Sequence, residues 1–241
     1  MFFYKNCGET TSEFSNRIKK TKRCNKVCIC GKLDPMARGI TKILIDNDTK
    51  KMKHYLTSDK EYEFNIVIGI STNSDDIMGN IEEYETINIS NINIYINKIM
   101  MYMNNLVNIT EQKYHHYSAI HINKNGVNKP LWYWYKNNNL LDSEIPTKKI
   151  RVYQVTHLNT EYIKFNLYLS DVICRLNMVK DNNFDKNKII NEWNSININT
   201  LVSIRFKVHV SSGFYIRMIA KDLKRLNIKV HIYDINRTKV Y

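Results

Sequence analysis

Glycine and proline are scarce in this sequence, with seven and three residues among 241. Average usage would give about 17 glycines and about 12 prolines. No Pro/Gly/Ser-rich linker therefore divides the chain, and its apolar content of 43% is enough for one sizeable core. We expect a single domain spanning residues 1–241, without an internal repeat.

Other features that the sequence lacks restrict the class of protein. No apolar run approaches the ~18 residues that a membrane-spanning helix needs, no helix has a clean basic face that would suit a membrane surface, and the start MFFYKNCGETT has no signal-peptide pattern. The five cysteines are an odd number, which suits a reducing compartment better than a disulfide framework. Cys24, Cys28 and Cys30 form C-x3-C-x-C, but no second Cys/His pair at zinc spacing follows. We expect an intracellular, cytoplasmic protein without bound metal or membrane.

Acidic residues are outnumbered by basic ones, 23 against 36, which gives a net charge of +13 and indicates a polyanionic partner, with nucleic acid as the leading candidate. Six basic residues fall within ten positions. They are Arg17, Lys19, Lys20, Lys22, Arg23 and Lys26. Such a run is commonly a solvated helix face. Because a candidate functional loop follows it, we expect it to contact nucleic-acid phosphates.

Hydrophobic periodicity predicts the secondary structure. Thr10 and Glu13 have the spacing of a capping box, which predicts a short helix containing Phe14 and Ile18. Helical spacing also predicts helices at 90–106 and 215–226. Strand-like patterns cover 61–69, 150–158, 162–169, 201–210 and 229–235. This mixed order predicts an α+β fold with a largely antiparallel sheet flanked by helices.

The segment GKLDPMARGI, residues 31–40, places a carboxylate between two of the scarce glycines. Pro35 biases Asp34 toward an extended conformation, so Asp34 is expected on a loop. An isolated Asp-Pro usually only stabilises a turn. The flanking Gly31 and Gly39 make a functional carboxylate the sharper hypothesis, since glycine permits backbone conformations that other residues avoid.

GKLDPMARG resembles the Gly-x-Leu-Asp-Pro-x-Ala-x-Gly signature of the TruB family of RNA pseudouridine synthases. Five further segments resemble other motifs of that family, in the same order: YKNCGETTS, DKEYEFNIVIGISTNSDDIMG, QKYHHYSAIHINKNG, IPTKKIRVYQV and VSSGFYIRMIAKDL. Asn6 stands where a proline is usual, and Tyr114 and His115 stand in place of two prolines. The resemblance covers nearly the whole chain.

The resemblance implies a pseudouridine synthase-like catalytic domain. Such an enzyme breaks the glycosidic bond of a uridine in folded RNA, turns the uracil and rejoins it through carbon 5, without a cofactor or metal. The family's best-known target is the T-loop uridine at position 55 of tRNA. Asp34 would be the catalytic residue, as a nucleophile or as a base, and the sequence leaves both roles open.

The resemblance also implies roles for other residues. Arg217 would hold Asp34 charged and oriented, although read alone it is an exposed helix arginine. Tyr62 would stack on the extracted base or assist proton transfer, although read alone it is a strand aromatic. Asp76 and Tyr215 would line or support the pocket, and Ile235 would pack on the uracil.

Two departures from the family pattern affect these expectations. Ile29 occupies the place of a histidine that helps to evict the target base, although an aliphatic wedge could still fill the gap in the RNA stack. We also expect no carboxyl-terminal RNA-binding domain after DINRTKVY. We therefore expect a monomer that binds RNA through the basic surfaces of its catalytic domain.

Two alternatives to a tRNA-modifying enzyme stay open. The chain could be a non-catalytic RNA-binding or RNA-folding module that kept the synthase fold, as Ile29 and the lost prolines would allow. It could also resemble the catalytic subunit of a guide-RNA particle, although the lack of an accessory domain counts against this. The joint presence of Asp34, Tyr62 and Arg217 favours the enzyme, because a binding module has no need of a buried Asp–Arg pair.

Overall fold

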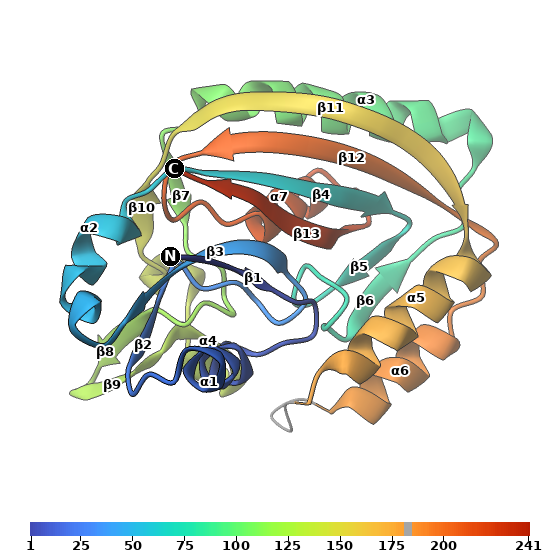
Figure 1. Ribbon diagram of the computed structural model, residues 1–241. Helices are drawn as coiled ribbons and strands as arrows, with labels where there is room; N and C mark the ends of the chain where they lie inside the picture. The colour runs from blue at the N-terminus through green and yellow to red at the C-terminus, as the bar shows by residue number, and fades with distance from the viewer. Residues whose placement is uncertain (181–184) are drawn as a thin grey trace.

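The computed structural model describes residues 1–180 and 185–241, with residues 89 and 90 described by their backbone alone. Its main feature is a seven-stranded sheet with the order β1-β3-β13-β4-β12-β11, in which β2 also pairs with β3. All neighbours are antiparallel except β3 and β13 (Figure 1). The strands are β1 (Phe2–Lys5), β2 (Val27–Cys30), β3 (Arg38–Ile45), β4 (Lys60–Ile68), β11 (Val152–Lys164), β12 (Thr200–Val210) and β13 (Val230–Val240).

Three two-stranded ribbons accompany the main sheet. They pair β5 (Ile70–Thr72) with β6 (Ile81–Tyr84), β7 (Glu111–Lys113) with β10 (Thr147–Lys149), and β8 (His121–Lys124) with β9 (Val127–Pro130). The α-helices are α1 (Thr11–Lys22), α2 (Met52–Leu56), α3 (Ile89–Asn105), α4 (Leu131–Lys136), α5 (Phe165–Met178), α6 (Lys186–Asn194) and α7 (Arg217–Lys224). Short 3-10 helices are η1 (Asp46–Lys51), η2 (Leu106–Asn108) and η3 (Asp142–Glu144).

The sheet has a buried cluster on each face, because alternate residues of a strand point to opposite sides. Phe64 and Ile66 of β4 pack in one cluster with α3 and α7. Their neighbour Val67 packs in another cluster with α5 and α6, which lie side by side at one end of the sheet (Figure 1). A third, smaller cluster joins α1 to β3. The predicted α+β fold is confirmed.

The start of α1 is the predicted capping box. Thr10 Oγ1 accepts a hydrogen bond from the Glu13 amide at 3.2 Å, and the Thr10 amide donates to Glu13 Oε2 at 2.9 Å. Phe14 and Ile18 are completely buried. The helices expected at 90–106 and 215–226 are also present, the second as the shorter α7.

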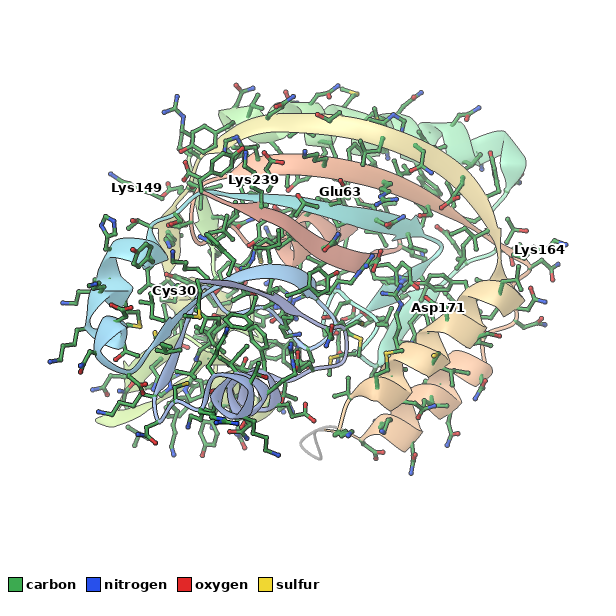
Figure 2. All side chains as sticks on the ribbon, viewed as in Figure 1. Cys30, Glu63, Lys149, Lys164, Asp171 and Lys239 are labelled. Atoms are coloured by element: carbon green, nitrogen blue, oxygen red, sulfur yellow. The ribbon has the colours of Figure 1, made fainter. Side chains whose placement is uncertain are left out.

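One part of the predicted secondary structure is wrong. Residues 152–158 and 162–164 of the two strand-like runs belong to the single strand β11, which ends at Lys164. Residues 165–169 of the second run lie in α5, which begins at Phe165. Figure 2 labels Lys164 at this junction and Asp171 within the helix. Phe165, Tyr168 and Val172 recur at helical spacing and are all buried, so the helical period extends beyond the window from which a strand was inferred.

Candidate active site

Asp34 lies on the loop between β2 and β3, as its position before Pro35 predicts. The Ala37 amide donates to the Asp34 carbonyl oxygen at 3.0 Å, and the Gly8 amide donates to the Pro35 carbonyl oxygen at 2.9 Å. The two flanking glycines, Gly31 and Gly39, have φ of +85° and +124°. Backbone hydrogen bonds therefore fix the loop at Asp34 and directly after it.

A buried lysine lies under this loop. Lys5 is 2% exposed at the end of β1, and its Nζ donates to the carbonyl oxygens of Asp34, Pro35 and Ala37 at 3.1, 3.2 and 2.8 Å. Burial lowers the pKa of Lys5 to about 8. Lys5 thus orders the backbone of the Asp34 loop through its carbonyl oxygens and not through the Asp34 carboxylate. The sequence analysis missed this role, although Lys5 belongs to one of the family-like segments.

The structure brings Arg217 and Asp34 together. Arg217, the first residue of α7, lies with its Nε 2.9 Å from Asp34 Oδ2. Its Nη1 donates to the Ser74 carbonyl oxygen at 3.1 Å and lies 3.6 Å from Asp76 Oδ2. The Arg217 side chain is 6% exposed and that of Asp34 is 40% exposed. A buried cation therefore lies beside a carboxylate that solvent can reach.

Asp76 lies near a different nitrogen of Arg217 from the one that faces Asp34. Its Oδ1 accepts hydrogen bonds from Ser74 Oγ at 2.6 Å and from the Met78 amide at 2.9 Å. Burial raises the pKa of Asp76, and the Arg217 charge opposes that shift. Burial works to lower the pKa of Arg217, but Asp34, Asp76 and Asp75 outweigh it and raise the pKa. The guanidinium therefore stays charged.

Tyr215 precedes Arg217 by two residues and is tied to the segment around Tyr114. The Tyr215 hydroxyl shares a hydrogen bond with Ser118 Oγ at 2.8 Å, and its ring meets that of Tyr114 edge to face at 5.5 Å. Gln112 binds the Tyr215 backbone at both its amide and its carbonyl oxygen. Burial raises the pKa of Tyr215, so its hydroxyl stays protonated at neutral pH.

Tyr62 and Ile235 lie in the main buried cluster together with Leu33, the residue before Asp34. Tyr62 is 7% exposed and Ile235 is 8% exposed, so both side chains are largely buried. The Arg237 guanidinium lies 6.0 Å from the centroid of the Tyr62 ring. Their contacts with a base stay predictions.

Ile29 lies in β2 opposite Ile43 and packs against the cluster of Phe14, Ile18 and Ile43 beneath α1. This packing accounts for an aliphatic residue at the position. Its action as a wedge in RNA stays a prediction.

The basic run divides into two kinds of residue. Arg17 is engaged inside the protein, because its Nε lies 2.6 Å from Glu9 Oε1 and its Nη2 donates to the Tyr4 carbonyl oxygen. The others are exposed at the end of α1 and just beyond it: Lys19, Lys20, Lys22, Arg23 and Lys26. Within residues 1–180 and 185–241, none of these five makes an ion pair with a carboxylate within 4.0 Å. They form an unneutralised basic surface.

The part of the chain that the structure describes holds no group of three or more His, Cys, Asp or Glu side chains arranged to bind a metal ion. It also holds no helix long and apolar enough to cross a membrane. A cavity of about 640 Å³ is lined in part by Asp75, Lys221 and Lys224. Asp34 does not line it.

Asp34 and Arg217 thus form a carboxylate–guanidinium pair on a loop of an α+β fold, and this fold is that of the pseudouridine synthase class. The crystal structure of a Cbf5-Nop10-Gar1 complex contains a chain with this fold, matching at a TM-score of 0.53 and 17% identity over 98% of this chain and 47% of that one. The model described as TruB family pseudouridylate synthase (N terminal domain) matches residues 19–173. The chain belongs to the TruB family.

Curated relatives include proteins named tRNA pseudouridine synthase B. The one from Staphylococcus saprophyticus is 23% identical over 239 residues, which are 98% of this chain and 64% of the relative. The one from Mycoplasma mycoides is 28% identical over 232 residues, which are 95% of this chain and 63% of the relative. The chain thus spans somewhat less than two thirds of the length of these relatives.

Proposed function

We propose that the protein isomerises a specific uridine to pseudouridine in folded RNA, and that the substrate is the T-loop uridine at position 55 of tRNA. The observation that carries the proposal is the Asp34–Arg217 pair, formed by two motifs that lie 217 − 34 = 183 positions apart. The names of the curated relatives support tRNA as the substrate.

The proposed reaction needs no outside reactant. The bond between N1 and the ribose C1′ breaks, a bond between C5 and C1′ forms, and the proton lost from C5 is balanced by one gained at N1. Asp34 is the catalytic residue, attacking as a nucleophile or taking a ribose proton as a base. Arg217 fixes the orientation of Asp34, and the buried side chains of Tyr62 and Ile235 contact the extracted uracil.

RNA binding is proposed to use the basic surface at the end of α1. Its five exposed cations lack competing carboxylates among the described residues, so they can contact RNA phosphates. Arg17 takes part only if it leaves Glu9. We place the protein in the cytoplasm as a monomer that binds the tRNA T-arm, with Ile29 packing against the gap that the evicted base leaves.

The test is the conversion of uridine to pseudouridine in an unmodified tRNA transcript, mapped at single-nucleotide resolution. Wild-type protein is expected to modify one T-loop uridine, and Asp34→Asn is expected to lower the rate by about 10³-fold or more. Unchanged RNA affinity and unfolding midpoint of Asp34→Asn would show that only chemistry is lost. Full activity of Asp34→Asn would refute the assignment of the catalytic residue.

A non-catalytic RNA-binding module is the second candidate, favoured by Ile29 and by the two prolines replaced at Tyr114 and His115. It predicts salt-sensitive tRNA binding without any conversion. Ile29→His separates the two cases: a gain of conversion would show an enzyme limited by base eviction, whereas continued inactivity on several RNAs would favour the binding module.

A further inference from the structure

Two loops meet behind Arg217, and one residue joins them. The Ser74–Asp76 segment holds Arg217 through the Ser74 carbonyl oxygen and the Asp76 carboxylate. The segment 114–118 supports Tyr215 through Tyr114 and Ser118. His115 of the second loop contacts Asp75 of the first, with 2.9 Å between Nε2 and Oδ2.

Asp75 is a fixed anchor for this contact. Its side chain is 3% exposed, and its Oδ1 lies 2.6 Å from Lys224 Nζ on α7. Its carbonyl oxygen accepts a hydrogen bond from the Ile232 amide of β13 at 2.9 Å. Asp75 also has φ of +61°, a strained conformation for a residue with a side chain, which persists when its surroundings determine it.

The hydrogen bonds assign the protonation of His115. Its Nδ1 lies 3.2 Å from the Tyr117 amide nitrogen, which can only donate, so Nδ1 is the acceptor. Nε2 then carries the proton and donates it to Asp75. Ring protonation would place a second N–H against the Tyr117 amide. The same loop is closed by the Ser118 amide, which donates to the His115 carbonyl oxygen at 2.8 Å.

The charges around His115 also favour the neutral ring. It is completely buried, which lowers its pKa, and Arg217, His116 and Lys221 lower it further, while Asp34 and the contacting Asp75 carboxylate favour the charged form. Burial dominates this balance.

We propose that His115 is a positioning residue for the reaction. Its neutral Nε2–H donates to Asp75 and so joins the segment 114–118, which supports Tyr215, to the Ser74–Asp76 segment, which holds Arg217. The inference rests on the proposed function. His115 stands where the family-like motif has a proline, which would restrict the loop through its ring. In this chain a side-chain hydrogen bond to Asp75 replaces that restriction. Loss of the bond lets Tyr215 and Arg217 move relative to Asp34.

The kinetic test compares three variants. His115→Phe fills the space without a donor, and His115→Ala leaves the space empty. Both variants are expected to lower kcat by about 10- to 100-fold and to change KM by less than about threefold. The reason is that misplaced catalytic groups reduce the rate more than they reduce binding. His115→Gln, which can donate to Asp75, is expected to recover kcat to within about threefold of wild type. His54→Gln, an exposed histidine on α2, is the matched control.

Wild-type kcat in His115→Phe, or a kcat of His115→Gln as low as that of His115→Phe at equal thermal stability, would overturn the proposal. A measurement independent of activity uses nitrogen NMR of the histidine rings. The His115 ring is expected to stay in the Nε2–H form between pH 8 and 5.5. An Nδ1–H form, or titration near pH 6.5, would overturn the tether even if catalysis is present. Absence of wild-type conversion would instead refute the proposed function, and the ring spectrum would still decide the tether.

Discussion

At the residue scale, the interior of this protein contains charged groups that each have a defined task. Lys5 binds loop carbonyl oxygens, Arg217 binds two carboxylates, and Arg237 binds two carbonyl oxygens and a hydroxyl. All three are at most 5% exposed. Since burying an unpaired charge is costly, these side chains fix the positions of the groups that they bind.

Arg217 provides the sharpest test of this view. Arg217→Met leaves the buried Asp76 without its cation and is expected to lower the free energy of unfolding by about 3 kcal/mol. Arg217→Lys keeps the charge but cannot contact Asp34, Asp76 and the Ser74 carbonyl oxygen together, so kcat is expected to fall by about 10²-fold. Urea unfolding and single-turnover kinetics measure the two effects.

Arg205→Met is the matched control for Arg217→Met. Arg205 pairs with Glu63 at 2.6 Å but is 42% exposed, so its loss is expected to cost less than about 1 kcal/mol. Equal destabilisation by the two substitutions would contradict the importance of burial.

His231 predicts how stability depends on pH. It is completely buried, its Nδ1 donates to the Ile70 carbonyl oxygen at 2.8 Å, and its Nε2 accepts from the Tyr168 hydroxyl. Burial lowers the pKa of His231 to about 4. Because the unfolded chain takes up the proton near pH 6.5, the stability that neutral His231 contributes is present above that pH and is lost as the pH falls toward 4.

Between pH 7 and pH 5, this loss is expected to be about 2 kcal/mol in the free energy of unfolding. Urea unfolding of wild type and His231→Gln at both pH values isolates it, since the variant lacks this titration. His54→Gln should keep the wild-type pH dependence. A pH dependence of His231→Gln parallel to that of wild type would show that another group is responsible.

At the element scale, the parallel contact between β3 and β13 determines where the Asp34 loop enters the sheet. Gly39 pairs with Arg237, and a Cβ on Gly39 would lie 2.3 Å from the Arg237 carbonyl oxygen. The Arg237 side chain donates to the Gly31 carbonyl oxygen at the start of the loop. The two strands and the loop are thus packed as one unit.

Gly39→Ala is therefore expected to lower the free energy of unfolding by about 3 kcal/mol or more, because backbone atoms of β13 cannot move aside cheaply. Gly126→Ala is the control: it also has positive φ, at +80°, but no atom lies within 4 Å of its added Cβ. Its cost should be the conformational strain alone, about 1 kcal/mol. Equal unfolding midpoints for the two variants would contradict a steric cause.

At the scale of the whole molecule, the net charge is +13, and the basic residues differ in whether a carboxylate neutralises them. Many lysines and arginines are in ion pairs, such as Lys188 with Glu192 on α6 at 3.9 Å. The exposed cations at the end of α1 are not neutralised in this way within the described chain. The cations without a paired carboxylate are therefore expected to contribute most to phosphate contact.

RNA affinity should fall steeply with salt, with a log–log slope proportional to the number of phosphates contacted. Lys20→Gln and Arg23→Gln are each expected to reduce the magnitude of that slope by about 1. Lys188→Gln serves as the control and should leave it unchanged. Binding of tRNA measured from low to moderate salt tests this, and a slope that Lys20→Gln and Arg23→Gln leave unaltered would exclude the α1 surface as a phosphate contact.

The sequence alone determined the elements whose signals are local. The capping box at Thr10, the alternation of β4 and β12, the loop position of Asp34 and the helical spacing of α3 all depend on neighbouring residues. The resemblance to family motifs also identified Asp34 and Arg217 as partners. Hydrophobic periodicity predicted the wrong element at the β11–α5 junction, because a short apolar run fits both the strand period and the helix period.

Only the tertiary structure decided which groups surround the candidate site. Lys5 has the local pattern of an edge-strand lysine, and nothing near it in sequence shows that the Asp34 loop will cover it. His115 and Asp75 are 40 positions apart, and their contact exists because the sheet brings their loops together behind Arg217. Burial and pairing of charged groups depend on how segments far apart in the sequence pack against one another. Local periodicity does not encode that packing.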